Sequence, residues 1–130
     1  MMRSRLTTTI ATHEWVWGDP ERIGQVLRNL LGNAAKYSPA GTPIEVRVEL
    51  HGERVRIAVA DHGFGIHPDD VARIFEKFGR GRDQAGRQVA GLGLGPYLSR
   101  RIVQAHGAEL SVDSTPGVGA VFAFDLAVAG

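Results

Sequence analysis

The stretch DPERIGQVLRNLLGNAAKYSPAGTPIEVRVELHGERVRIAVAD, residues 19–61, contains a helical pattern followed by a strand pattern. Up to residue 37, apolar residues recur every three or four positions and form one helix face: Ile23, Val26, Leu27, Leu30, Leu31 and Ala34. Residues 44–50 and 54–61 alternate apolar and polar side chains around a short turn at 51–53, as in an antiparallel hairpin. An amphipathic helix beside a half-buried hairpin predicts a fold of the α+β class.

The boundaries of this helix are marked in the sequence. Asp19 can accept hydrogen bonds from the free N–H groups of the first turn, and Pro20 suits the first helical position. Residues 38–41 contain a proline and a glycine that end the helix. Before it, residues 5–10 and 14–17 are rich in β-branched and aromatic residues and predict two short extended segments.

The C-terminal part of the chain repeats these elements. Residues 97–105 predict a second long helix that ends at Gly107. Residues 108–114 and 118–128 predict a second hairpin around the turn at 115–117.

Residues 68–78 predict a short helix, whereas residues 79–95 hold six glycines among polar residues and predict a mobile loop. The elements together predict a two-layer α/β sandwich, in which a mixed sheet of about five strands packs on three helices. The two long helices are expected on one face of the sheet. No repeat or linker divides the sequence, so residues 1–130 are expected to form a single domain.

Composition argues against several classes of function. The 130 residues carry a formal net charge of only +1, which gives no reason to expect nucleic acid as a partner. The absence of cysteine excludes a disulfide framework and a thiol nucleophile, and it fits a cytoplasmic location. No apolar stretch reaches the length of a membrane-spanning helix, so direct membrane insertion is not expected, although a longer parent protein with a membrane anchor is compatible with this.

The first helix carries a polar face opposite its apolar stripe. Gln25, Asn29 and Asn33 follow one another at intervals of four, and Lys36 extends this face by three residues. The face is a candidate ligand site. An ordinary solvated helix surface is the alternative.

The sequence DHGFGI, residues 61–66, comes directly after an apolar strand. Asp61 can project from the strand end and accept a hydrogen bond from an exocyclic amine, while Gly63 and Gly65 let the backbone approach a planar ligand. A tight turn with a capping aspartate is the alternative.

The sequence GLGLG, residues 91–95, leads into the second long helix. Unhindered N–H groups at the positive end of a helix dipole suit a phosphate chain. This is neither a Walker loop nor a dinucleotide fingerprint, because no GK[ST] follows and the spacing differs. A glycine-rich hinge without a ligand is the alternative.

Four stretches occur in an order that resembles one known family. Residues 25–38 resemble an asparagine box, 61–66 a first glycine box, 74–81 a phenylalanine box, and 91–95 followed by 100–107 a second glycine box. These are the boxes of the catalytic domain of two-component sensor histidine kinases, within the GHKL superfamily. The resemblance implies the Bergerat ATP-binding fold, with ATP and Mg²⁺ as ligands.

The resemblance also implies roles for single residues. Asn33 would coordinate Mg²⁺, and Asn29 would help to orient the metal or the phosphates. Lys36 would contact phosphate, Tyr37 the nucleotide, and Asp61 the adenine amino group. The other nucleotide-binding residues that it implies are Gly63, Gly65, Ile66, Phe78, Gly91, Leu92, Gly93, Leu94 and Gly95.

By the same resemblance, residues 67–95 would form an ATP lid that Phe75 and Phe78 anchor. Arg80 or Arg82 would reach the γ-phosphate when the lid closes, so that Asn29, Lys36 and Arg80 are the candidate catalytic residues. Solvated loop charges are the alternative for both arginines.

Asn29 separates this chain from hydrolytic members of the superfamily and from anti-sigma-type serine kinases, which by the resemblance have glutamate there as a general base. An amide cannot take a proton, whereas a neutral imidazole acceptor is already a nucleophile. We therefore expect transfer to a histidine. A nucleotide-sensing module without transfer activity and an anti-sigma-type serine kinase are the alternatives.

The acceptor histidine is expected on a separate dimerisation domain or partner chain, with a response regulator as an indirect partner and this chain as a monomer. The neighbours of His13 place it on a strand, where a structural role is expected. Surface or capping roles are expected for the other histidines, which are His51, His62, His67 and His106.

Overall fold

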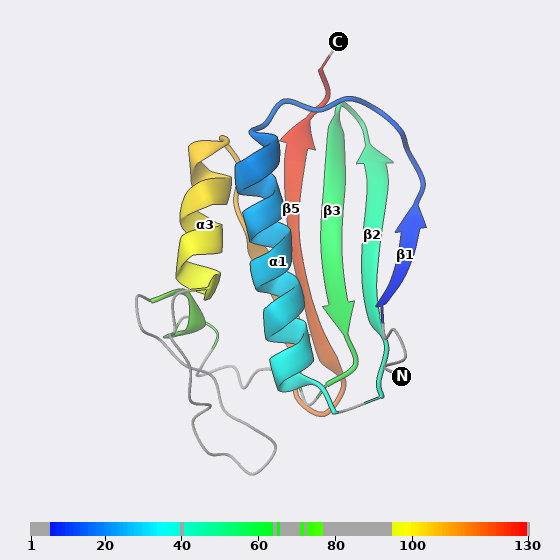
Figure 1. The fold of residues 1–130 in the computed structure, drawn as a ribbon, viewed down its shortest axis with the longest axis vertical. Helices are drawn as coiled ribbons and strands as arrows, with labels where there is room; N and C mark the ends of the chain where they lie inside the picture. Colours follow the sequence, from blue (N-terminus) through cyan, green and yellow to red (C-terminus); the bar gives the residue numbers. More distant parts are fainter. Residues whose placement is uncertain are drawn as a thin grey trace.

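The structure is a computed structural model and describes residues 6–39, 41–63, 65, 71, 73–76 and 95–129. In chain order the elements are β1 (Leu6–Ile10), α1 (Pro20–Tyr37), β2 (Ile44–His51), β3 (Arg54–Asp61), the 3₁₀ turn η1 (Arg73–Phe75), α3 (Gly95–Ala105), β4 (Ser111–Thr115) and β5 (Gly119–Ala127) (Figure 1).

The five strands form one mixed sheet in the order β1-β2-β3-β5-β4. β1 pairs with β2 in parallel, and the other three pairs are antiparallel. Both predicted hairpins are confirmed, although β4 begins at Ser111 rather than at residue 108. The central pair of β3 and β5 joins segments far apart in the sequence, with Val59 opposite Phe122.

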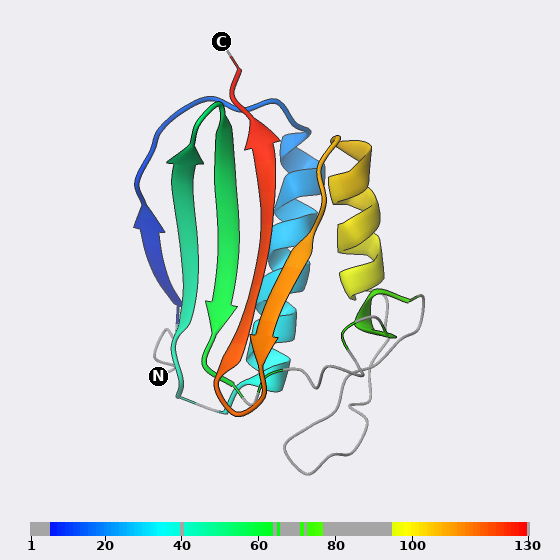
Figure 2. The same cartoon turned by 180° about the vertical axis from the view of Figure 1, so that it is seen from behind.

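Both long helices cover the same face of the sheet, and the opposite face is open (Figures 1 and 2). The pleat directs alternate side chains of β3 and β5 toward the helices, where Val59 and Leu126 are buried. From α1, Val26 and Leu30 are almost fully buried in the same cluster. Burying each such side chain stabilises the fold by about 1.5–3 kcal/mol, so the predicted apolar stripe of α1 is the helix side of the core.

The start of α1 has the predicted cap. Asp19 has an extended backbone, and its Oδ1 accepts hydrogen bonds from the N–H groups of Glu21 (3.0 Å) and Arg22 (3.3 Å). Pro20 occupies the first helical position, and the helix ends before Ser38.

We predict that Asp19→Ala lowers the free energy of unfolding by about 1 kcal/mol, because two N–H groups of the first turn lose their acceptor. Urea denaturation followed by circular dichroism measures the change. Asp19→Asn keeps an oxygen at the same place and should lose much less. Equal losses in the two variants would contradict a capping role.

The helices predicted after β3 are only partly matched by the described residues. The described part of the chain contains two α-helices and one 3₁₀ turn, so a third helix at 68–78 is not confirmed; Val71 and residues 73–76 are the described part of that range. α3 begins at Gly95, two residues before the predicted start, because Pro96 is compatible with a first helical turn.

His13 lies outside the strands, contrary to the prediction. The segment around it crosses the end of the sheet and is held by single backbone hydrogen bonds, such as Ala11 N–H to Val48 O (2.8 Å). Between residues 14 and 17, Val16 forms an isolated bridge with Val128. A crossing segment cannot keep the regular register that a strand needs, although its composition resembles one.

Neither of the helices described here carries an apolar run of the length that crossing a bilayer requires.

Candidate functional site

Three of the sequence motifs meet at one end of the molecule. Figure 1 shows that the C-terminal end of α1, the end of β3 and the N-terminal end of α3 lie at the same end. Asn29 and Asn33 lie in the C-terminal half of α1, Asp61 is the last residue of β3, and α3 begins at Gly95. The fold therefore turns these three segments toward the same end of the molecule.

Asp61 is the last residue of β3 and is only 8% exposed. It shares the helix-covered face with Val59, because residues two apart in a strand point the same way. Its Oδ1 accepts hydrogen bonds from the N–H groups of Gly63 (2.9 Å) and Ala120 (3.3 Å). Two backbone donors on one oxygen fix the orientation of the carboxylate.

The loop after β3 packs closely on the turn between β4 and β5. Gly65 has φ +74°, and a Cβ there would overlap the carbonyl oxygen of Thr115. Gly119 has φ +146°, and a Cβ there would overlap the carbonyl oxygen of Asp61. Backbone packing therefore requires glycine at both positions. For Gly65, the reason expected from the sequence was instead the approach of a ligand to the backbone.

Asn29 lies beside the start of α3. A Cβ built on Gly95 would stand 3.9 Å from the Cβ of Asn29. The Asn29 Nδ2 is buried and has no acceptor among the residues that the structure describes. A buried amide donor without an acceptor is a costly feature in a folded protein, so Asn29 remains a candidate for contact with a ligand oxygen.

The other polar residues of α1 differ in their surroundings. Asn33 is partly buried, and Lys36 is exposed near the C-terminal end of the helix. Gln25 lies one turn before Asn29, and its Oε1 accepts a hydrogen bond from Arg22 (3.2 Å). Gln25 thus belongs to the helix surface, and the asparagines lie nearer the site.

Phe75 holds η1 against the rest of the domain. Its ring packs edge-on against Phe122 at 6.3 Å between centroids, and the Arg100 guanidinium lies 5.4 Å from the Phe75 ring centroid. Ile74 beside it is 2% exposed. This contact with β5 and α3 is the kind of anchor that the resemblance implies for Phe75.

Several predicted site residues lie outside the described residues. They are Ile66, Phe78, Arg80, Arg82, Gly91, Leu92, Gly93 and Leu94, together with the side chain of Tyr37 and most of the range 67–95.

The histidines that the structure describes have the surface or capping roles that were predicted. His51 is exposed and its Nε2 lies 3.0 Å from Glu49 Oε2, and His62 is also exposed. His106 lies at the end of α3, and His67 is outside the described residues. Within the described ranges, no group of three or more His, Cys, Asp or Glu side chains could hold a metal ion.

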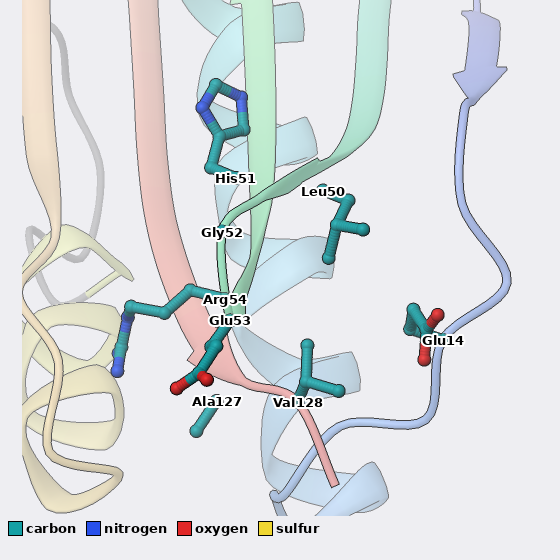
Figure 3. Close-up of a pocket in the computed structure, with 8 residues that line it drawn as sticks. All are labelled: Glu14, Leu50, His51, Gly52, Glu53, Arg54, Ala127 and Val128. Atoms are coloured by element: carbon teal, nitrogen blue, oxygen red, sulfur yellow. The ribbon is translucent and has the colours of Figure 1, made fainter. Parts of the chain in front are cut away.

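A cavity of about 780 Å³ lies away from Asp61 and the asparagines. Its lining comes from the β2–β3 turn, the end of β5 and the segment at Glu14 (Figure 3). A smaller cavity of about 240 Å³ touches Asp61, but Arg47 and Asp113 place it on the open face of the sheet. Neither cavity includes α1, so the candidate site is defined by the convergence of the motifs.

Ala120 and Gly119 are site residues that the sequence analysis missed. Ala120 supplies one of the two N–H groups that orient Asp61, from 59 positions further along the chain. The sequence gives little indication of their role, because neither residue has a functional group in its side chain. Pairing the last strand with residues 54–61 was the step that could have revealed them.

Comparisons with known proteins identify the family and the fold. A family model described as histidine kinase-, DNA gyrase B-, and HSP90-like ATPase matches residues 18–130. The sensor histidine kinase AruS of Pseudomonas aeruginosa is 42% identical in an alignment of 122 residues that covers 90% of this chain and 12% of AruS. The chain thus spans a small part of that relative.

Two solved structures share the fold. The mycobacterial sensor histidine kinase MprB has a TM-score of 0.80 at 30% identity, over 97% of this chain and 86% of the MprB chain. ShkA, solved at full length in complex with AMPPNP, has a TM-score of 0.80 at 33% identity, over 96% of this chain and 26% of ShkA.

Proposed function

Since the chain belongs to the family of histidine kinase-, DNA gyrase B-, and HSP90-like ATPases, we propose that it binds ATP with Mg²⁺ and transfers the γ-phosphoryl group to a histidine on a separate domain. The observation that carries this proposal is the position of Asn29, with its buried and unpaired Nδ2, against Gly95 at the start of α3. The end of β3, where Asp61 stands, lies at the same end of the molecule as the start of α3 (Figure 1). The carboxylate suits the base of a nucleoside triphosphate, and the amide and the helix N-terminus suit its phosphates. The similarity to sensor histidine kinases supports a histidine as the acceptor.

Asp61 is proposed to bind the adenine amino group. In the described part of the chain, both hydrogen bonds to the carboxylate use Oδ1, and Oδ2 is then available to accept from the exocyclic amine. A guanine offers a carbonyl oxygen at that position, which repels a carboxylate. The site would therefore favour ATP over GTP.

The phosphates are proposed to lie between α1 and the start of α3. The buried Asn29 Nδ2 lacks an acceptor, and a phosphate oxygen would provide one. In the first turn of α3 the backbone N–H groups of Gly95 and Tyr97 lie at the positive end of the helix dipole, since Pro96 has no N–H, and Lys36 adds a positive charge at the end of α1.

The donor chemistry of α1 also fits a divalent cation. Asn33 offers a neutral amide oxygen one turn after Asn29, and oxygen ligands are what Mg²⁺ prefers. When bound, Mg²⁺ supplies positive charge beside the phosphates. The chain's own residues hold the triphosphate in line for the acceptor and bring no general base to water, because Asn29 cannot take a proton.

The remaining assignments rest on the family resemblance. Tyr37 and Ile66 would line the nucleotide pocket, residues 91–94 would continue the phosphate loop, and Phe78 would help to anchor a lid over residues 67–95. Arg80 would stabilise the γ-phosphate when that lid closes.

The partners follow from the length of the relatives. The chain covers 12% of AruS, so we propose that the acceptor histidine lies on a dimerisation domain of a longer parent protein or of a partner chain. A response regulator would then receive the phosphoryl group. We propose that the chain acts in the cytoplasm and is a monomer when separated from that domain.

The test mixes the chain, Mg²⁺ and γ-labelled ATP with candidate dimerisation domains. The expected result is acid-labile, base-stable label on the acceptor domain, and none when its histidine is replaced. Acid-stable label would indicate a serine kinase instead. ATP binding without label on any candidate would favour a sensing module, and a chain that does not bind ATP would overturn the proposal.

A further inference from the structure

His106 connects α1 and α3 at the end of the helix pair opposite the nucleotide site. Its Nε2 accepts a hydrogen bond from the backbone N–H of Asp19 (3.0 Å). Its Nδ1 lies 2.8 Å from the carbonyl oxygen of Ile102, one helical turn earlier, and donates to it. The neutral ring therefore has its proton on Nδ1 and its free lone pair on Nε2.

This contact completes the cap of α1 from another helix. In a capping box, the residue at the third helical position accepts from the N–H of the capping residue. Here that position is Arg22, whose guanidinium has only N–H donors and cannot accept a hydrogen bond. Asp19 still caps the first turn with its own side chain, so the N–H of Asp19 is left for His106.

The His106 ring packs next to Gly18. A Cβ on Gly18 would stand 3.4 Å from the His106 Cδ2 and 3.4 Å from the Ile23 Cγ1. The imidazole therefore lies close against the backbone that enters α1.

The two helices run in opposite directions, so α3 is held against α1 at both of its ends (Figure 1). At one end His106 binds Asp19, and at the other Gly95 meets Asn29. The eleven residues of α3 make a rigid rod of about 16 Å between these contacts. A shift at His106 would be transmitted along the helix axis to Gly95.

We propose that His106 is a positioning residue for nucleotide binding: by holding α3 in register on α1, it sets where the backbone N–H of Gly95 stands relative to Asn29. This inference rests on the proposed binding of the phosphates between these two groups. It assigns a functional consequence to a histidine that touches neither the nucleotide nor the acceptor.

Two substitutions separate the link between helices from the local bond. His106→Gln has an amide oxygen at about the reach of Nε2, so it can still accept from Asp19. His106→Asn can donate to Ile102 as Nδ1 does, but it is too short to reach Asp19. His51→Ala removes an exposed histidine at the end of β2, which contacts neither α1 nor α3 in any described hydrogen bond, and serves as the control.

The dissociation constant for ATP and the ¹⁵N–¹H spectrum are measured for each folded variant. We expect His106→Asn to bind ATP about fivefold more weakly, the effect of one hydrogen bond, and His106→Gln to remain near wild type. The amide signal of Gly95 should shift in His106→Asn and not in His51→Ala.

A loss of thermal stability in His106→Asn with unchanged ATP affinity and an unchanged Gly95 signal would overturn the inference, since a merely structural contact predicts that result. If the wild-type chain does not bind ATP, the proposed function fails. The position of the Gly95 signal still decides whether His106 sets the register of α3.

Discussion

An Asn33→Ala variant is expected to transfer phosphoryl groups at least about 100-fold more slowly than the wild-type chain, because it lacks the amide oxygen proposed to hold Mg²⁺. The fold should survive. Asn33 is only partly buried, and alanine is the best helix former, so α1 loses no propensity. The loss should therefore appear in function and not in the midpoint of urea unfolding.

The measurement is the initial rate of acceptor labelling, together with ATP binding in the presence of Mg²⁺ and in the presence of EDTA. The variant should bind ATP equally with and without the metal, whereas the wild-type chain should bind more tightly with it. Gln25→Ala, two turns earlier on the same helix face, is the matched control and should transfer normally. An Asn33→Ala variant with a normal rate and normal Mg²⁺ dependence would remove Asn33 from the metal site.

Asp61→Asn is expected to weaken ATP binding by about 10- to 100-fold. The N–H groups of Gly63 and Ala120 require an acceptor at the position of the present Oδ1. The new side chain must place its amide oxygen there, which turns the NH₂ group toward the base. Two donors, the amide and the adenine amine, would then face each other.

Selectivity provides the sharper readout for this variant. The ratio of ATP to GTP affinity should fall, because a donor at this position suits the guanine carbonyl oxygen. Asp113→Asn, an exposed aspartate on β4, is the control and should keep both affinities. An Asp61→Asn chain that retains the full preference for ATP would rule out Asp61 as the group that binds adenine.

The elements themselves follow from local sequence. The apolar stripe of residues 19–37 and the cap at Asp19 predicted α1, and the period-two pattern predicted the hairpin of β2 and β3. These features depend on residues within a few positions of one another, which is why they could be predicted. The helix predicted at 68–78 is not confirmed, because most of that range lies outside the described residues; the 3₁₀ turn at Arg73–Phe75 falls within it.

The candidate site was predicted as a set of motifs, and its assembly was not. Nothing in the sequence places Gly95 against Asn29, because that contact depends on how α3 packs along α1. The same holds for Ala120, whose N–H reaches Asp61 only through the pairing of β3 with β5. Such contacts join residues that a local pattern cannot relate.

The amino-acid order alone was enough to specify the helices, the hairpins and the chemical type of each candidate group, because hydrophobic periodicity, caps and turns act over short distances along the chain. Only the folded molecule decided which glycines the backbone needs for packing and which N–H groups orient Asp61. It also decided that His106 caps a helix 87 positions away. The physical reason is that these contacts arise where strands and helices pack, and their geometry belongs to the assembled core.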